Sequence, residues 1–163
     1  MSSQIAPADF RRAMASFATG ITVIAVEGPD GVHAMTASAF MSGSLAPPLV
    51  VLCVDRKSRM HDLLLGADRF GVSVLNAAQQ EVSSHFANQA RAPEAPRFSR
   101  QWGAPVLQQA LTRIVAAHES HHDCGDHTLF VGRVEQIGHE GGPPLLHFAG
   151  RYHRLAGLET ATA

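Results

Sequence analysis

The residues best suited to ligand chemistry lie between His33 and Ser58, where small side chains precede a cationic loop. Thr36-Ala37-Ser38-Ala39 is a run of small residues, and small side chains on a strand let a flat ring approach the backbone amides. Asp55-Arg56-Lys57-Ser58 comes just before a helical pattern, and two cations beside free N–H groups at a helix N-terminus suit a phosphate. The pattern favours a ligand with a flat ring and a phosphate. It also fits a plain strand pair followed by an ordinary N-cap at Ser58.

A second group of reactive side chains runs from His118 to His127 and includes Cys124. Histidine and cysteine are good zinc ligands, but their spacing here fits no standard zinc pattern and no second ligand cluster lies elsewhere. We therefore assign no metal ligand, and three interpretations of the cluster stay open: a metal site, an exposed polar hairpin tip, or a His127 that contacts a ligand. In Gly125-Asp126-His127 the glycine allows a sharp bend, and the aspartate can orient the imidazole that follows it.

A third group lies at His147 to Tyr152, where rings alternate with small or charged residues. Arg151 and Tyr152 can bind the phosphates or ribose of a dinucleotide, although an exposed arginine beside a tyrosine needs no ligand and core packing accounts for Phe148. The chain has no GxGxxG after a strand, no GxxxxGK[ST] and no GxSxG. Any nucleotide is therefore held by an architecture other than a Rossmann fold or a P-loop.

The length and composition limit the class of protein. With 163 residues, 45% of them hydrophobic and 17% charged, the chain is expected to form one globular domain over residues 1–163. A net charge of −1 argues against non-specific nucleic-acid binding. The first residues lack a signal-peptide core and no apolar run reaches the length of a membrane span. Two cysteines in different settings, Cys53 and Cys124, favour a reducing cytoplasm over a structural disulfide.

Hydrophobic periodicity predicts the elements that position these groups. We expect a first helix over Ala8–Phe17 that ends at Gly20, a helix over Arg59–Leu65 closed by Gly66, and a helix over Ala77–Phe86. Asn76, with Gln79 three residues on, is expected to cap this third helix. Besides the strands on either side of the small-residue run, we expect strands at Ile21–Val26, Leu49–Val54, Phe70–Leu75, Leu111–Glu119, Thr128–Ile137 and Leu145–Leu155.

The segment from Asn88 to Pro105 shows no period, and a structureless loop of that length is often functional or a mobile flap. Phe98 and Trp102 are its large residues, and they either pin the loop to the core or face a ligand. Seven or eight strands, mostly linked by hairpins, with a polar bend over Ser120–Asp126, indicate a mainly β fold. We predict a small closed or partly closed antiparallel barrel with helical decoration.

Five segments, in this order, resemble the short-chain flavin reductase family, the FMN-binding split-barrel proteins. They are Phe17–Val23, Met35–Phe40, Ser44–Val50, Gly125–Gly132 and Gly150–Tyr152, and the resemblance covers about residues 8 to 155. It implies an antiparallel, Greek-key-like split barrel that forms a homodimer, with flavin near the subunit interface. It also implies that NADH or NADPH reduces FMN or FAD, and that the reduced flavin goes to a separate monooxygenase.

The resemblance also implies the roles of particular residues. Near the flavin it places the following residues, which line the ring, face the ribityl phosphate or close over the tail: Thr36, Ala37, Ser38, Ala39, Phe40, Met41, Ser42, Ser44, Asp55, Arg56, Lys57, Ser58, Arg59, Phe86, Arg97 and Phe98. Near the nicotinamide nucleotide it places Gly125, Asp126, His127, His147, Phe148, Gly150, Arg151 and Tyr152. His127 is the candidate catalytic residue, because imidazole can position the nicotinamide or move a proton near neutral pH.

Two other classes of protein share such a barrel. One is a non-catalytic split barrel that holds flavin or haem. Haem stays among the alternatives because the chain has ten histidines. The other is an enzyme like pyridoxamine-phosphate oxidase, with bound FMN and a different substrate. Turnover of NADH with added flavin separates a reductase from a carrier.

Overall fold

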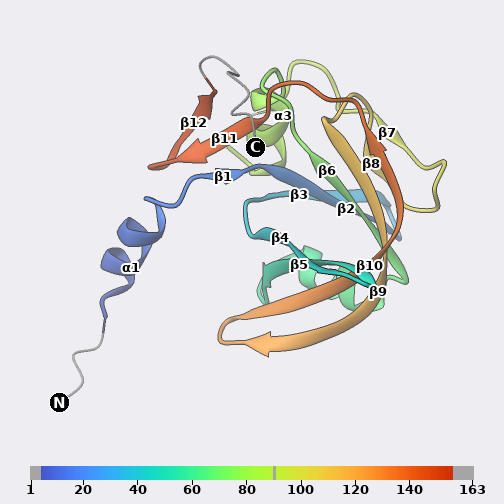
Figure 1. Ribbon diagram of the computed structural model, residues 1–163, viewed down its shortest axis with the longest axis horizontal. Coiled ribbons are helices and arrows are strands. Elements are labelled where there is room, and N and C mark those ends of the chain that lie inside the picture. Colours follow the sequence, from blue (N-terminus) through green and yellow to red (C-terminus); the bar gives the residue numbers. More distant parts are fainter. Residues whose placement is uncertain (1–4, 90, 156–163) are drawn as a thin grey trace.

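The main sheet has seven strands, and every neighbouring pair in it is antiparallel. In the computed structural model, which describes residues 5–89 and 91–155, the strands follow the order β3-β2-β6-β9-β10-β5-β4 (Figure 1). Their bounds are β2 Thr22–Gly28, β3 Gly31–Ala37, β4 Phe40–Leu45, β5 Pro48–Asp55, β6 Arg69–Val74, β9 Thr112–Cys124 and β10 His127–His139. The prediction of a mainly β, antiparallel fold is confirmed.

The two edge strands of this sheet, β3 and β4, are consecutive in the chain. Only Ser38 and Ala39 join them, so the sheet must curl until its edges meet, as Figure 1 shows. The backbone N–H of Phe40 donates to the carbonyl of Ser38 at 3.0 Å, which makes this link a tight turn. The small-residue run of the sequence therefore lies at the seam of a split barrel, with Ser38 and Ala39 exposed.

The interior of the barrel follows from the alternation of buried side chains along its strands. On β5, Val50, Leu52 and Val54 point inward and are at most 5% exposed. Across the sheet, Phe70 and Phe130 are fully buried, and a Cβ atom at Gly132 would overlap the ring of Phe70. Each such buried side chain contributes about 1.5–3 kcal/mol to stability.

The described residues form three short helices: α1 Pro7–Met14, α2 Arg59–Gly66 and α3 Gln80–Phe86. The Oγ atom of Ser58 accepts a hydrogen bond from the N–H of His61 at 3.2 Å, so the predicted N-cap of α2 is confirmed. Met60 and Leu64 then fix α2 to the core. Helix α1 buries none of its residues and projects away from the barrel (Figure 1).

Two smaller sheets complete the described part of the chain. One contains β1 Thr19–Gly20, β11 Leu145–Phe148 and β12 Arg151–Arg154, in the order β1-β11-β12. The other pairs β7 Phe98–Ser99 with β8 Val106–Leu107. The described chain thus has twelve strands rather than the seven or eight expected, because its shortest strands carry too few residues to show a period.

Several predicted boundaries were wrong. The first helix ends at Met14, and Gly20 lies in β1 opposite Leu146 rather than ending a helix. The expected last strand over 145–155 is a hairpin, because Ala149 and Gly150 adopt positive φ angles of 50° and 74° that reverse the chain. The predicted bend over 120–126 was also wrong: β9 continues to Cys124, and only Gly125 and Asp126 form the turn.

The third helix begins at Gln80, three residues later than predicted. The predicted cap was wrong: the side chain of Gln79 accepts from Asn76 as in a capping box, but the side chain of Asn76 accepts from Ala78 and not from Gln79, in a turn that precedes the helix. The N–H of Asn76 donates to Oε1 of Gln79, and Oδ1 of Asn76 accepts from the N–H of Ala78, each at 3.0 Å. The N–H of Ala77 is bound by the carbonyl of Pro143, which holds this turn against another segment.

The segment 88–105 is not structureless, since Phe98 and Ser99 form β7. Trp102 packs beside Ala104, Val106 and Val115, and the guanidinium of Arg113 lies 5.6 Å from the centre of its ring. The interpretation of Trp102 as a residue that anchors the loop to the core is therefore confirmed.

Candidate active site

Two hydrogen bonds through Ser83 join the seam of the barrel to the β11–β12 hairpin. The Oγ1 atom of Thr36 donates to the carbonyl of Ser83 at 2.7 Å, and the Oγ atom of Ser83 lies 3.0 Å from the hydroxyl of Tyr152. The structure thus brings together Thr36, expected at the flavin, and Tyr152, expected at the nicotinamide. Because the proton of Thr36 is committed to Ser83, this hydroxyl can only accept a hydrogen bond from a ligand.

Ser83 was missed by the sequence analysis. It lies on α3 and is fully buried, and its carbonyl and its hydroxyl make the hydrogen bonds to Thr36 and Tyr152. Its signal in the sequence is faint: a serine among Val82 and Phe86, on the side of a short helix that packs against the barrel. Serine is common enough in helices that this position alone predicts nothing.

The Asp55–Arg59 loop differs from its prediction in one respect. Its backbone N–H groups are largely committed: that of Lys57 to Oδ1 of Asp55 at 2.8 Å, and that of Ser58 to the carbonyl of Asp55 at 3.0 Å. The N–H of Arg56 donates to the carbonyl of Asp126 at 3.2 Å. The expectation of free N–H groups in this loop was wrong for these three residues. A phosphate at this loop must therefore be bound mainly by side chains.

Among these side chains, Lys57 is the most available. Arg56 is paired with Asp123, and Arg59 lies 3.0 Å from Asp30. Within residues 5–89 and 91–155, the exposed Lys57 has no ion pair. It is also the sole lysine of the 163-residue sequence, a signal that the sequence analysis did not use.

The same loop lies beside the turn that carries His127. The hydrogen bond from Arg56 to Asp126 joins them, and in the β5–β10 pairing His127 is directly opposite Asp55. Two segments about seventy residues apart in the chain, 55–59 and 125–127, therefore form one continuous surface. The structure brings these two predicted groups together.

The predicted orientation of His127 by Asp126 is present. The Nδ1–H group of His127 donates to Oδ1 of Asp126 at 2.7 Å. This hydrogen bond and the charge of the imidazole lower the pKa of the Asp126 carboxyl, and the charge of Lys57 adds to the effect. Since Nδ1 is held by the carboxylate, Nε2 of the partly exposed His127 is left to face a ligand.

The seam of the barrel and this loop are connected by one strand, β5. The N–H of Cys53 donates to the carbonyl of Ala39 at 3.1 Å, and Asp55 follows two residues later on β5. At about 3.3 Å per residue the seam and the loop are about 7 Å apart along the strand. Burial raises the pKa of the Cys53 thiol, and the nearby Cys124 and Asp126 raise it further, so Cys53 is held as a neutral thiol on this surface.

The remaining residues predicted at the nicotinamide lie on the β11–β12 hairpin. His147 is opposite Tyr152, with ring centres 6.0 Å apart, and Phe148 is opposite Arg151. Gly150, in the turn, and Arg151 are exposed. The structure links this hairpin to Thr36 through Tyr152, but shows no contact between it and Gly125–His127.

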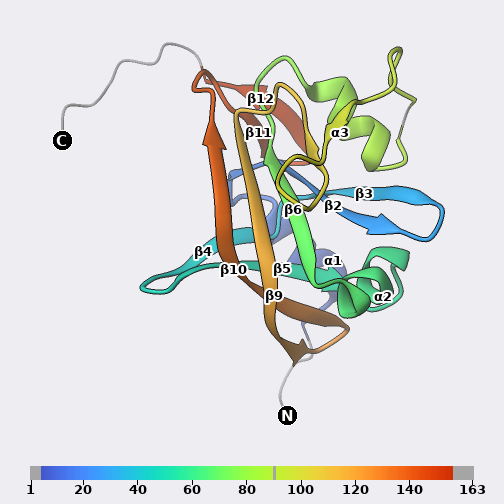
Figure 2. The same ribbon diagram turned by 90° about the vertical axis from the view of Figure 1, so that its right-hand side faces the viewer.

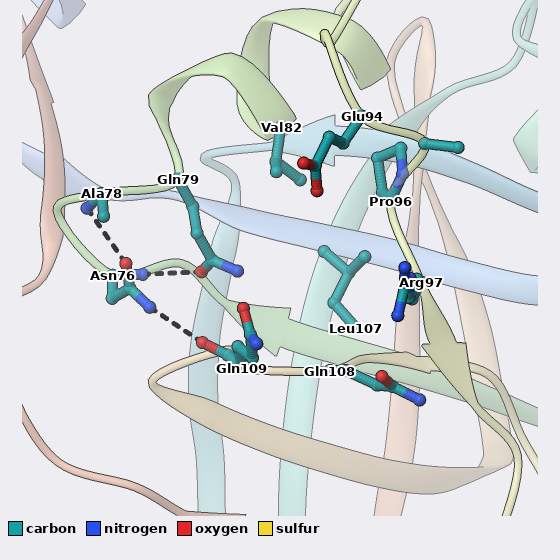
Figure 3. A pocket seen from close by; sticks show the side chains of 11 residues that line it. Asn76, Ala78, Gln79, Val82, Glu94, Pro96, Arg97, Leu107, Gln108 and Gln109 are labelled. Atoms are coloured by element: carbon teal, nitrogen blue, oxygen red, sulfur yellow. Dashed lines mark hydrogen bonds between the residues drawn. The ribbon is translucent and has the colours of Figure 1, made fainter.

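The residues predicted to close over the flavin tail separate into two places. Phe86 and Phe98 pack edge to face with ring centres 5.8 Å apart, in the apolar cluster that includes Tyr152. Arg97 instead lines a cavity of about 390 Å³, shown in Figure 3, between α3 and the segments before β7 and after β8. That cavity is lined by Asn76, Ala78, Gln79, Val82, Glu94, Ala95, Pro96, Arg97, Leu107, Gln108 and Gln109.

On β4, the predicted flavin residues follow the strand away from the seam. Phe40 is half-buried and packs against the barrel core, whereas Met41 is 60% exposed. Ser42 is exposed and Ser44 is half-buried, on either side of a bulge in the β4–β5 pairing. They lie on the open edge of the sheet.

Two negative findings concern the described residues. No three or more of their histidine, cysteine, aspartate and glutamate side chains are arranged to hold a metal ion. None of their helices is long and apolar enough to cross a membrane.

The comparisons with known proteins agree with this architecture. An NADH-dependent flavin reductase of Rhodococcus sp is 38% identical over 155 residues, 93% of this chain and 88% of that protein. The styrene monooxygenase flavin reductase of Pseudomonas putida S12 is 43% identical, with a TM-score of 0.83 over 90% of this chain and 97% of that one.

The NADH:FAD oxidoreductase SgcE6 of Streptomyces globisporus C-1027, solved with NAD and FAD fragments, is 32% identical with a TM-score of 0.86. The match covers 99% of this chain and 100% of that one. The family model described as "Flavin reductase like domain" matches residues 14–156. The chain therefore belongs to the flavin reductase like domain family, as its sequence resemblance implied.

Proposed function

We propose that this chain is an NADH-dependent flavin reductase that reduces FMN or FAD and supplies the reduced flavin to a separate monooxygenase. The names of its relatives support the reaction, the hydride donor and the link to a monooxygenase. The seam supports a place for the ring, because Ser38 and Ala39 are small and exposed where the barrel edges meet. The isoalloxazine lies against this seam.

The ribityl phosphate lies at the 55–59 loop. Lys57 supplies a positive charge free of an ion pair, and the hydroxyl of Ser58, whose oxygen accepts from His61, keeps its proton for the ligand. The distance of about 7 Å along β5 from the seam to this loop suits the short chain between a flavin ring and its phosphate. The residues of the seam and of the 55–59 loop therefore fit a flavin and its phosphate.

Hydride transfer is chemistry of the two bound nucleotides, and the protein supplies orientation. His127 is the candidate for positioning the nicotinamide or moving a proton, since Asp126 fixes its ring and leaves Nε2 to face outward. Tyr152 and the exposed Arg151 on the β11–β12 hairpin contribute to holding the dinucleotide. Lys57 also places a positive charge near the His127 turn, as its effect on Asp126 indicates.

The active form is a homodimer. Helix α1 has no buried residue, and Phe10, Met14 and Phe17 are 59%, 51% and 69% exposed. Exposed aromatic and aliphatic residues grouped on one projecting element are typical of an interaction surface. Met41 and Leu45 on the open edge strand β4, the latter 94% exposed, extend the apolar area available to a second copy. The two free cysteines agree with a reducing, cytoplasmic setting.

One observation carries the proposal: the hydrogen bond from Arg56 to Asp126 places the His127 turn against the loop that holds the phosphate. The test is to mix the protein with NADH and a catalytic amount of FMN or FAD in air, following the NADH absorbance. Many turnovers per protein, and slower turnover with NADPH, support the reductase. A coloured protein that is inert to NADH contradicts it and supports a carrier instead.

A further inference from the structure

Three histidine rings lie around Phe130. Phe130 belongs to the β9–β10 hairpin, whose end lies next to α2 (Figure 2). The ring centres of His61, His118 and His121 lie 5.6, 5.8 and 6.1 Å from that of Phe130. Nε2 of His118 lies only 3.3 Å from Nδ1 of His121. The flavin reductase reaction proposed above uses neither of these two residues.

A β-bulge brings His118 and His121 to the same face of the sheet. Residues three apart on a regular strand point to opposite faces. Here Val131 pairs with Ser120 and the next residue, Gly132, pairs with His118, so Glu119 is an extra residue without a partner of its own. Bulges re-aim side chains in this way, and they are often found beside functional sites.

The spacing of the two nitrogens suits a metal ion. Zinc binds imidazole nitrogen at about 2.0–2.1 Å with tetrahedral geometry, which places two such nitrogens about 3.3–3.4 Å apart. Imidazole is also a good ligand for copper and nickel. His61 is not a third ligand, because both of its ring nitrogens are already bound. Its Nε2 lies 3.0 Å from Oγ1 of Thr128 and its Nδ1 lies 3.2 Å from Oδ1 of Asp62.

We propose that His118 and His121 chelate one divalent transition ion of the kind that prefers imidazole, such as Zn²⁺ or Ni²⁺. With two protein ligands, the other coordination positions are filled by water, so the ion exchanges readily with solution. This agrees with the finding that no described group of three ligands surrounds the pair. The ion would fix the bulge and the end of the hairpin, and the site is independent of the flavin chemistry.

The alternative is a simple N–H···N hydrogen bond between two neutral imidazoles, and a titration distinguishes the two. Tag-free protein carrying Cys124→Ser, which removes the exposed thiol from competition, is titrated with Zn²⁺ and with Ni²⁺ by calorimetry. In this background we compare His118→Gln and His121→Gln with His122→Gln. His122 is the matched control, because it lies on the same strand and its Nε2 is 3.2 Å from Oγ of Ser120 rather than near another imidazole.

We expect either of the first two substitutions to weaken the tightest site by roughly a hundredfold, because the second bond of a chelate forms at high effective concentration. His122→Gln should leave that site unchanged. Imidazole NMR spectra of the parent protein provide a second test that does not depend on the folding of a variant. Zinc should shift the ring signals of His118 and His121 together and leave His122 in place. Equal affinities in all variants, or no joint shift, would overturn the proposal.

Discussion

The hydroxyl of Tyr152 lies 3.0 Å from Oγ of Ser83, and the carbonyl of that same serine accepts a hydrogen bond from the hydroxyl of Thr36. One buried residue of α3 therefore connects the seam of the barrel with the last hairpin. A ligand lying on the seam and a ligand held by the hairpin would both contact residues of this connection.

Tyr152→Phe removes one of these hydrogen bonds and should lower the free energy of unfolding by about 1 kcal/mol. In a domain of this size that corresponds to a fall in Tm of about 2–4 °C. A double-mutant cycle with Ser83→Ala, measured by urea unfolding, should show coupling between the two side chains. Strictly additive losses would mean that the hydroxyl pair contributes nothing.

His127→Ala should lower kcat/KM for NADH about ten- to a hundredfold, because an oriented imidazole is lost from beside the reacting ring. Flavin affinity, measured by fluorescence quenching, should change little. Asp126→Asn should have a smaller effect in the same direction, since it removes only the group that orients the ring at 2.7 Å. Unchanged turnover in His127→Ala would remove this residue from the mechanism.

Lys57→Gln should weaken FMN binding about tenfold, since charge-assisted hydrogen bonds to phosphate are among the stronger ones. Riboflavin, which has no phosphate, should bind equally well to both proteins. Arg100→Gln removes a charge of the same sign that is engaged with Glu27, and serves as the control. An equal loss for FMN and riboflavin would indicate general damage to the site and not a lost phosphate contact.

His33 makes stability depend on pH. Burial, and then the charge of Arg59, lower the pKa of His33 below its ordinary value of 6.5. As the pH falls below 6.5, the unfolded chain takes up a proton at this position before the folded chain does, so the free energy of unfolding falls. His33→Gln should flatten this slope in urea unfolding measured above and below that pH. Parallel curves for the wild type and His33→Gln would contradict the assignment.

Substituting Phe10, Met14 and Phe17 by serine should convert the proposed dimer to a monomer, because these exposed side chains form the apolar surface of α1 and of the residues that follow it. Light scattering coupled to gel filtration measures the mass directly. Substituting the polar Arg11 and Arg12 of the same helix by serine is the control and should leave the dimer intact. A wild-type protein that is monomeric at micromolar concentration would refute the dimer.

The long, strongly patterned elements were predictable from the sequence, and the short ones were not. The inward alternation of Val50, Leu52 and Val54 marks β5, and Ser58 caps α2 as its position suggests. By contrast, the reversal at Ala149 and Gly150 depends on two positive φ angles, and only the second residue is a glycine. A two-residue strand such as Thr19–Gly20 has no period to detect and exists because β11 supplies its partner.

The segments of the candidate site were predictable from the sequence, but the contacts between those segments were not. The small residues at 36–39 and the Asp126–His127 pair can be recognised in the sequence, because each consists of residues that are adjacent in the chain. The hydrogen bond from Arg56 to Asp126 and the role of Ser83 depend on tertiary contacts across about seventy residues. Of the N–H groups in the 55–58 loop that sequence reasoning expected to be free, only that of Arg56 is bound by a distant residue, whereas those of Lys57 and Ser58 are bound locally by Asp55.

A crystal structure with FMN bound tests the central claim most directly. The ring should lie against the backbone of Thr36 to Phe40, with its phosphate within hydrogen-bond distance of Lys57 and Ser58. Nε2 of His127 should face the open side of the ring, on which the nicotinamide stacks. A flavin found elsewhere, or packed side chains that leave no space at the seam, would contradict the account.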